Sequence, residues 1–315
     1  MIDKFCYNFY KHDGEINMQF NQVTLADKAM FNSFLQGRKQ QLITYCFSSF
    51  YLWRNWDPYS WAIVEDALVV KSNYNNLDTI CVPIAADDAA VLRATEAMIK
   101  DYQQAGKEFI ISEVSADAWR FYEQHWPGRF VAEDYREGAN YIYLQSDLAH
   151  LPGKKFDAKR NQINRFKRNY PDDQLLPITR ELVDGCKEEL NIWMSRHDSK
   201  DHELQQEYQG SVDALDHLEE LDCEGAALLI GNKVRAFTIG EPLNDDTYCI
   251  HIEKGDINIP GVYQAINCFY AREYTEGYQY INRAEDMGAE GLRKAKSSYN
   301  PCRMEHKYYL RLKNA

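Results

Sequence analysis

Residues 247–267 read Thr-Tyr-Cys-Ile-His-Ile-Glu-Lys-Gly-Asp-Ile-Asn-Ile-Pro-Gly-Val-Tyr-Gln-Ala-Ile-Asn. The first seven are mostly β-branched, aromatic or otherwise apolar, which is typical of a strand. The turn-forming Asn-Ile-Pro-Gly at 258–261 interrupts this run, and apolar residues then recur at helical spacing. We therefore predict a strand over 247–253 and a helix over 261–276, joined by a polar turn.

The residues on either side of this segment continue the alternation of strands and helices. Gly231-Asn232 separates two apolar runs and predicts a hairpin just before it. The expected strands of this half are 174–178, 225–230, 233–240, 247–253, 278–282 and 305–312, and the expected helices are 180–196, 203–221, 261–276 and 288–298.

The first half of the chain shows the same order of elements without a repeat of residues. Its expected strands are 19–25, 61–65, 67–71, 79–85, 108–114, 130–134 and 141–145, and its expected helices are 26–37, 48–56, 87–104 and 116–125. This order is that of the GNAT acyltransferase fold. The sequence therefore predicts an α/β (α+β) protein of two tandem GNAT-like acyl-CoA N-acyltransferase folds, each a mixed central sheet flanked by helices. We place an N-terminal domain at 1–150 and a C-terminal domain, carrying the expected active site, at 151–315.

Composition restricts the partners and the compartment. The 315 residues carry a formal net charge of −12, so the overall field does not steer the protein toward nucleic acid or an anionic membrane. No apolar run reaches the roughly 18 residues of a membrane helix, and the N-terminus does not resemble a signal peptide. We therefore expect a cytoplasmic protein without an integral membrane segment.

The cysteines are scattered along the chain and include no Cys-x-x-Cys pair. Such spacing is typical of reduced, mostly buried thiols, so we expect neither a disulfide framework nor a metal site. The eight positions are Cys6, Cys46, Cys81, Cys186, Cys223, Cys249, Cys268 and Cys302.

Polar residues concentrate where two predicted strands of the second half end. The carboxyl ends of neighbouring strands, beside helix starts, are where open α/β sheets bind ligands. His251 and Glu253 lie two apart on one strand, so we expect them on the same face. Each feature also has a purely structural interpretation: strand-end ion pairs, a hydrogen-bonded strand histidine, and packing of Tyr263 and Tyr299.

Four stretches of the second half resemble the phosphatidylglycerol lysyltransferase C-terminal domain family. The resemblance covers roughly residues 20 to 312 and is strongest after 155. It departs from the family at Ala284, where an acidic residue would be expected between Arg283 and Glu285. The stretches are Lys159-Arg160-Asn161-Gln-Ile-Asn164-Arg165-Phe166, His251-Ile-Glu253-Lys254, Gly261-Val-Tyr263-Gln264-Ala-Ile-Asn267, and Asn282-Arg283-Ala-Glu285-Asp286-Met-Gly288 through Gly291-Leu-Arg293-Lys294-Ala-Lys296-Ser-Ser-Tyr299.

Members of this family look like tandem GNAT folds related in architecture to Fem-type aminoacyltransferases. The resemblance implies transfer of an acyl or aminoacyl group to an amine or hydroxyl. The donor would be acyl-CoA or aminoacyl-tRNA, with no tightly bound cofactor, and the acceptor would be a small molecule, a peptide or a lipid headgroup. The alternative is a non-catalytic binding protein that retains the pocket, which the lost carboxylate at Ala284 favours.

The expected site draws on all four stretches. Glu253 is the first candidate for the base that deprotonates the acceptor, ahead of His251, and Tyr299 is the candidate for protonating a leaving group. The other expected catalytic residue is Asp286. The expected substrate-binding residues are Lys159, Arg160, Asn164, Arg165, Gly261, Tyr263, Gln264, Asn267, Asn282, Arg283, Glu285, Arg293 and Lys296.

A local basic segment at 154–168 contrasts with the acidic chain. It holds seven basic residues and a single acidic one, and its apolar residues fall at helical spacing. It is either a solvated helix that docks between domains or a clamp for phosphate, from tRNA, a lipid headgroup or a nucleotide-linked substrate. The expected helix of the first half begins with the carboxylates of Asp87 and Asp88, which would repel a phosphate. The corresponding helix of the second half begins at 258–261 with no acid in its first turn, so we expect only the second half to take a phosphate-bearing ligand.

Overall fold

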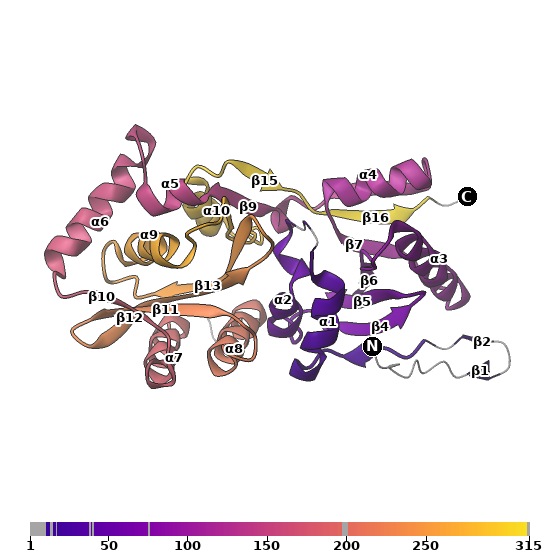
Figure 1. The fold of residues 1–315 in the computed structure, drawn as a ribbon, viewed down its shortest axis with the longest axis horizontal. Coiled ribbons are helices and arrows are strands. Elements are labelled where there is room, and N and C mark those ends of the chain that lie inside the picture. The colour runs from indigo at the N-terminus through magenta and orange to yellow at the C-terminus, as the bar shows by residue number, and fades with distance from the viewer. Residues whose placement is uncertain are drawn as a thin grey trace. The chain divides into compact units, whose positions relative to one another are not determined.

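The computed structural model describes residues 11–12, 15–16, 18–37, 39, 41–74, 76–196 and 201–313. The chain divides into two compact units (Figure 1). Unit 1 comprises residues 1–36, 57–135 and 307–315, and unit 2 comprises residues 37–56 and 136–306. Each unit contains a seven-stranded sheet with one parallel pair of strands, β6 with β7 in unit 1 and β13 with β14 in unit 2, among antiparallel ones. This arrangement confirms the predicted fold class.

In unit 1 the apolar faces of the helices pack on the sheet. Ala94 and Met98 of α3 are fully buried in one core together with Val69 and Ile111 of the strands. The sheet order is β3 (Asn21–Gln22), β4 (Ser60–Val64), β5 (Ala67–Tyr74), β6 (Leu77–Cys81), β7 (Ile110–Val114), β16 (Tyr308–Leu312) and β8 (Phe130–Asp134). The helices are α1 (Lys28–Leu35), α3 (Asp88–Gln104) and α4 (Ala116–His125), and β1 (Lys11–His12) pairs with β2 (Glu15–Ile16).

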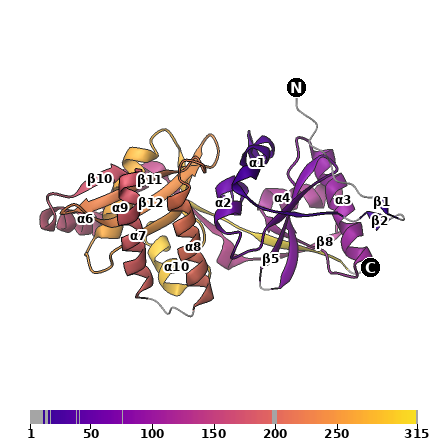
Figure 2. The ribbon, with the colours of Figure 1, turned by 90° about the horizontal axis from the view of Figure 1, so that it is seen from below.

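Unit 2 has helices on both faces of its sheet. Helix α9 lies on one side, and α7 and α8 lie on the other (Figures 1 and 2). The sheet order is β10 (Gln174–Pro177), β11 (Glu224–Ile230), β12 (Lys233–Pro242), β13 (Thr247–Gly255), β14 (Tyr280–Asn282), β9 (Asn140–Leu144) and β15 (Arg303–Glu305). The helices are α2 (Phe47–Leu52), α5 (Gln145–His150), α6 (Asp157–Asn169), α7 (Arg180–Met194), α8 (His202–Asp216), α9 (Val262–Tyr274) and α10 (Glu290–Ser297).

The two halves of the chain exchange one strand each. Strand β9, from the first half, lies between β14 and β15 in unit 2, and β16, from the end of the chain, lies between β7 and β8 in unit 1. The units therefore do not divide at residues 150 and 151 as the sequence suggested. The single strand expected over 305–312 is likewise two strands, β15 and β16, which belong to different sheets.

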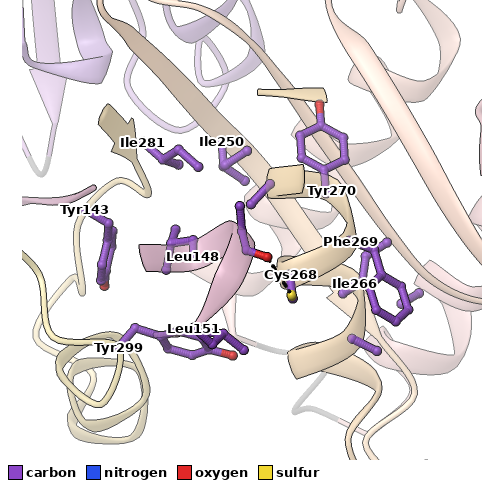
Figure 3. Close-up of a cluster of buried hydrophobic side chains, with 14 of the residues drawn as sticks. Tyr143, Leu148, Leu151, Ile250, Ile266, Cys268, Phe269, Tyr270, Ile281 and Tyr299 are labelled. Atoms are coloured by element: carbon purple, nitrogen blue, oxygen red, sulfur yellow. Dashed lines mark hydrogen bonds between the residues drawn. The ribbon is translucent and has the colours of Figure 1, made fainter. Parts of the chain in front are cut away.

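The core on the α9 side of unit 2 is rich in aromatic residues. It contains Tyr248, Tyr270 and Ile266, all essentially without exposed surface. Figure 3 shows Tyr143 and Tyr299 at one edge of this cluster. Both rings adjoin the polar residues described below, because the hydroxyl of Tyr143 donates to the backbone oxygen of Lys296 and Arg283 lies beside the ring of Tyr299.

None of the helices among the described residues combines the length and apolar character needed to cross a bilayer.

The cysteines agree with the expectation of mostly buried thiols. Among those whose structure is described, six are buried, Cys302 is exposed, and none forms a disulfide. Cys6 lies outside the described residues.

Candidate functional site

The candidate site lies where the two parallel strands of unit 2 separate. Strands β13 and β14 pair only at Thr247 with Tyr280, Tyr248 with Ile281 and Cys249 with Asn282. Beyond these pairs β14 ends, while β13 continues to Gly255 along β12. Divergence of neighbouring strands leaves room for side chains at their carboxyl ends, the position at which open α/β sheets bind ligands.

A β-bulge decides which side chains of β13 face this opening. Ile239 of β12 pairs with Ile252, but the next residue, Gly240, pairs with Ile250, so His251 is an extra residue in the ladder. Ile250 and Glu253 consequently line one small cavity on the α9 side. The prediction that His251 and Glu253 share a face is therefore wrong, because the bulge reverses the alternation between them.

His251 points instead into a buried cluster on its own side of the strand. Its Nε2 atom lies 2.8 Å from Oε1 of Glu241 and 3.8 Å from Sγ of Cys46. Burial by itself lowers the pKa of His251, but Cys46 and Glu241 outweigh it and raise this pKa to about 10. His251 is therefore neither near Glu253 nor poised to act as a base at neutral pH.

Glu253 forms a partly buried ion pair with Arg283, the first residue after β14. Nη2 of Arg283 donates to Oε1 of Glu253 at 2.9 Å, and Nδ2 of Asn267 on α9 donates to Oε2 at 3.0 Å. Both charged side chains are about one-eighth exposed. Thr238 lies directly opposite Glu253 in the β12–β13 register.

Three buried polar atoms around this pair are left without a hydrogen bond among the described residues. They are Nη1 of Arg283, Oδ1 of Asn267 and Oγ1 of Thr238. Buried polar groups in proteins nearly always have a partner, which can be a ligand or a water. The cavity lined by Thr238 and Asn267 has room for about one water molecule. Its lining is Leu148, Thr238, Ile250, Glu253, Asn267, Tyr270, Ala271 and Ile281.

A second group of predicted residues borders Arg283. Nζ of Lys159 lies 4.0 Å from the ring centre of Tyr299, and the guanidinium carbon of Arg283 lies 5.0 Å from the same ring. Burial, and then Arg283, lower the pKa of Lys159, whereas burial raises the pKa of Tyr299 and interaction with Gln264 opposes this. Tyr299 therefore remains a neutral phenol that can donate a hydrogen bond.

Lys296 supports the turn after β14 rather than the cavity. Its buried ammonium group donates to the backbone carbonyl oxygens of Arg283 and Glu285. Burial lowers its pKa to about 8, although Glu285 opposes the shift. Its ammonium group is thus used within the protein to hold this turn, which is the role of a positioning residue.

Arg293 belongs to a separate network around the buried carboxylate of Asp286, and neither residue lines the cavity of Glu253. Oδ1 and Oδ2 of Asp286 each accept a hydrogen bond from Arg293 at 3.0 Å, and Oδ2 also accepts from the hydroxyl of Tyr141 at 2.6 Å and from Arg136 at 3.2 Å. Asp286 has no exposed surface. The expectation that it lines one pocket with Glu253 is wrong, because all its acceptor sites are engaged in fixing the turn before α10.

Several other predicted binding residues have structural contacts. Nδ2 of buried Asn282 donates to the backbone oxygen of Gln41 and to Asn140, which in turn donates to Glu285. Arg160 donates to the backbone oxygens of Leu151 and Gly153. Three others differ: Tyr263 packs against the core of unit 2, and Asn164 and Arg165 are exposed on α6.

Gly261 has a packing reason to be glycine. Its φ is +90°, and a Cβ atom added there would lie 2.7 Å from the backbone oxygen of Gln162 on α6. The start of α9 therefore lies directly against the backbone of α6, which no larger residue would permit.

Sequence reasoning missed three residues at the site. Thr238 is placed by the β12–β13 register, which no local pattern reveals. Ser298 accepts a hydrogen bond from Nζ of Lys159 at 2.7 Å, and the hydroxyl of Tyr143 donates to the backbone oxygen of Lys296 at 2.8 Å. Ser298 adjoins Tyr299 in the sequence and could have been included on that ground.

Known proteins resemble this chain along most of its length. A protein of unknown function from Bacteroides thetaiotaomicron is 35% identical, with a TM-score of 0.87 over 94% of this chain and 100% of that one. The structure of L-PGS from Bacillus licheniformis is 15% identical, with a TM-score of 0.65 over 92% and 93% of the two chains, and so shares the fold.

A curated relative, the uncharacterized protein MYCGA3080 of Mycoplasmoides gallisepticum, is 26% identical over 172 residues. The match covers 53% of this chain and 54% of the relative, so it spans about half of that protein. The family described as phosphatidylglycerol lysyltransferase, C-terminal, matches residues 38–311. The chain therefore belongs to the phosphatidylglycerol lysyltransferase C-terminal family.

Proposed function

We propose that unit 2 transfers an aminoacyl or acyl group to an amine or hydroxyl acceptor at Glu253 and Arg283. The family supports an aminoacyltransferase-type activity, and its name suggests transfer of a lysyl group to phosphatidylglycerol, for which we propose lysyl-tRNA as the donor. The observation that carries the proposal is the partly buried Glu253–Arg283 pair at the divergence of β13 and β14, bordered by polar atoms that have no hydrogen bond among the described residues. An aminoacyl-tRNA donor would place the reaction in the cytoplasm.

The proposed chemistry uses direct transfer between two bound substrates. The free Nη1 of Arg283 would donate to the carbonyl oxygen of the donor, where negative charge develops in the transition state. Glu253 would accept the proton of the attacking amine or hydroxyl. As the new bond to the acyl carbon forms and the donor ester bond breaks, Tyr299 would donate a proton to the departing oxygen. Holding both substrates in place supplies much of the rate.

The assignment to unit 2 rests on the helix that follows the central strands in each unit. In unit 1 the carboxylate of Asp87 caps α3 and accepts a hydrogen bond from the N–H of Ala90 at 2.8 Å. A phosphate bound at the start of α3 would be repelled by that negative charge. The first turn of α9 in unit 2 contains no acidic residue, so this end favours an anion.

One observation favours a non-catalytic binding protein as the second candidate. Both carboxylate oxygens of Glu253 already accept a hydrogen bond, and the adjoining cavity has room for about one water molecule. Turnover therefore requires the acceptor to displace Asn267 or the cavity to widen. Binding alone needs no free carboxylate oxygen on Glu253, so the saturated carboxylate is compatible with a binding protein.

A transfer assay distinguishes the two candidates. The purified protein is incubated with radiolabelled lysyl-tRNA or with acetyl-CoA, and with phosphatidylglycerol vesicles or a mixture of amines as acceptor. We expect label to move from lysyl-tRNA to an acceptor. Tight binding of the donor without release of tRNA would support the binding protein, and neither binding nor transfer with any pair would contradict both.

The basic segment at 154–168 is the proposed contact for tRNA, but the structure divides its cations into two groups. Lys155 pairs with Asp147, and Lys167 pairs with Asp173, at 2.7 and 2.9 Å. Arg160 is bound to backbone oxygens. The exposed cations with the best access to a polyanion are Lys154, Arg165 and Arg168.

Reversing the three exposed charges, Lys154→Glu, Arg165→Glu and Arg168→Glu together, is expected to weaken tRNA binding roughly tenfold or more at low salt, because each phosphate contact contributes to counterion release. Filter binding at several salt concentrations measures the affinity and its salt dependence. Thermal stability should not change. Arg160→Ala, by contrast, should lower stability, and unchanged tRNA affinity in the triple variant would show that this segment only packs within unit 2.

A further inference from the structure

A second cluster of reactive side chains lies in unit 2, apart from Glu253. It brings together Cys46 at the start of α2, Glu241 on β12, and Cys249 and His251 on β13. One ligand atom of each residue lies within 4.8 Å of the others. Both cysteines are buried, and the side chain of His251 has no exposed surface. The bulge in β13 places His251 in this group.

The spacing of these atoms agrees with the edges of a tetrahedron around zinc. Zinc bonds of about 2.3 Å to sulfur and about 2.1 Å to nitrogen place the two ligand atoms roughly 3.6 Å apart at a tetrahedral angle. Nε2 of His251 lies 3.8 Å from Sγ of Cys46 and 3.5 Å from Sγ of Cys249. Its separation from Oε1 of Glu241 is 2.8 Å, so the carboxylate would move outward by roughly 0.6 Å to reach a common metal.

The donor set selects the kind of metal. Two thiolates and an imidazole favour zinc over magnesium or calcium, which prefer oxygen ligands alone. Four protein ligands fill the tetrahedral shell and leave no position for water or substrate, which distinguishes structural zinc sites from catalytic ones. Metal binding would release the thiol proton of Cys249 and the ring proton that His251 carries beside Cys46 and Glu241, and the ion would neutralise the resulting charges.

We propose that Cys46, Glu241, Cys249 and His251 bind one structural zinc ion. The ion would join the segment 37–56 to strands β12 and β13, which lie about two hundred residues further along the sequence yet in the same compact unit. This proposal revises the sequence-based expectation of no metal. That expectation relied on the absence of a Cys-x-x-Cys pair, but these ligands come from three separate segments.

The metal content of the reduced wild-type protein is the primary test. Protein purified with a reductant, incubated with zinc sulfate and passed through a desalting column is expected to retain about one zinc ion per chain, measured by inductively coupled plasma mass spectrometry. Cys249→Ser should bind zinc at least tenfold more weakly. Cys268→Ser is the control, because Cys268 is equally buried but lies in the core on the α9 side.

Cobalt(II) binding to the wild-type protein keeps the test decisive should Cys249→Ser fail to fold. A tetrahedral site with thiolate ligands gives intense visible ligand-field bands and a sulfur-to-cobalt charge-transfer band, and added zinc should abolish both. Reduced wild-type protein that retains no zinc and gives no such cobalt spectrum would overturn the proposal. Equal loss of zinc from Cys249→Ser and Cys268→Ser, with both folded, would also overturn it.

Discussion

Glu253→Gln is expected to lower the rate of transfer roughly 10²-fold or more, the usual contribution of a general base. Glutamine keeps the size of the side chain and an oxygen that can accept from Arg283. Its amide group can donate to Oδ1 of Asn267, which has no partner among the described residues of the wild-type protein, once the amide of Asn267 turns over. The protein should therefore still fold, but with a lower free energy of unfolding, because Arg283 loses its counter-charge. The measurement is the initial rate at saturating donor and acceptor, with thermal unfolding recorded alongside.

Glu207→Gln is the matched control for that experiment. Glu207 pairs with the buried ammonium group of Lys254, the residue next to Glu253 on β13. Its substitution also removes a carboxylate from an ion pair with this strand, but away from the cavity. We expect little change in rate. An equal loss in both variants, or full activity in Glu253→Gln, would show that Glu253 is not the base.

Asp286→Asn is expected to lower the free energy of unfolding by about 1.5–3 kcal/mol at pH 7, the range for hydrogen bonds to a charged group, because Arg136 and Arg293 keep contact with water. The carboxylate of Asp286 accepts hydrogen bonds from Arg293, Tyr141 and Arg136, and an amide cannot accept from all three. Urea-induced unfolding measures the difference. A loss below about 1 kcal/mol would mean that solvent readily replaces these contacts.

The pH dependence of this loss follows from the direction of the pKa shift. Burial by itself raises the pKa of Asp286, but the hydrogen bonds from Arg293 and Tyr141 outweigh it and hold the pKa well below its usual range. The folded state therefore binds this proton less readily than the unfolded state. The stabilisation is present above about pH 4, the usual Asp value, and is lost as the pH falls below it. The deficit of Asp286→Asn should accordingly be constant between pH 5 and 8.

Asp117→Asn provides the surface control. Asp117 pairs with Arg120 within one turn of α4, and both side chains are largely exposed. An exposed pair of this kind contributes about 0–1 kcal/mol. The control variant should therefore unfold like the wild type. A comparable loss in both variants would contradict a special role for the Asp286 network.

The order of strands and helices could be predicted from the sequence because it depends on local periodicity. The segment expected at 247–253 is β13, and the helix expected at 261–276 is α9. The exchange of β9 and β16 could not be predicted, because both read as ordinary strands and only long-range pairing decides which sheet receives each. The same limit applies to residues 305–312, where the apolar pattern runs through the point at which the chain leaves one sheet for the other.

The candidate site could be predicted in part, for similar reasons. Lys159, Gln264, Asn267, Arg283 and Tyr299 lie around Glu253, as expected from the stretches that carry the resemblance. The error at His251 has a single cause, a bulge that strict alternation along a strand does not anticipate. The four residues proposed to bind zinc could not be grouped from the sequence, because Cys46 and the residues of β12 and β13 approach one another only in the folded chain.

Hydrogen exchange with a non-reacting donor tests most directly whether the ligand site is in unit 2. The donor is a lysyl-tRNA in which an amide replaces the ester. We predict slower exchange in residues 250–255 and 283–287 of unit 2 on binding, and no change at Leu77–Cys81 and Ile110–Val114, the corresponding parallel strands of unit 1. Slower exchange in those unit 1 strands, with none in unit 2 although the donor binds, would contradict the assignment.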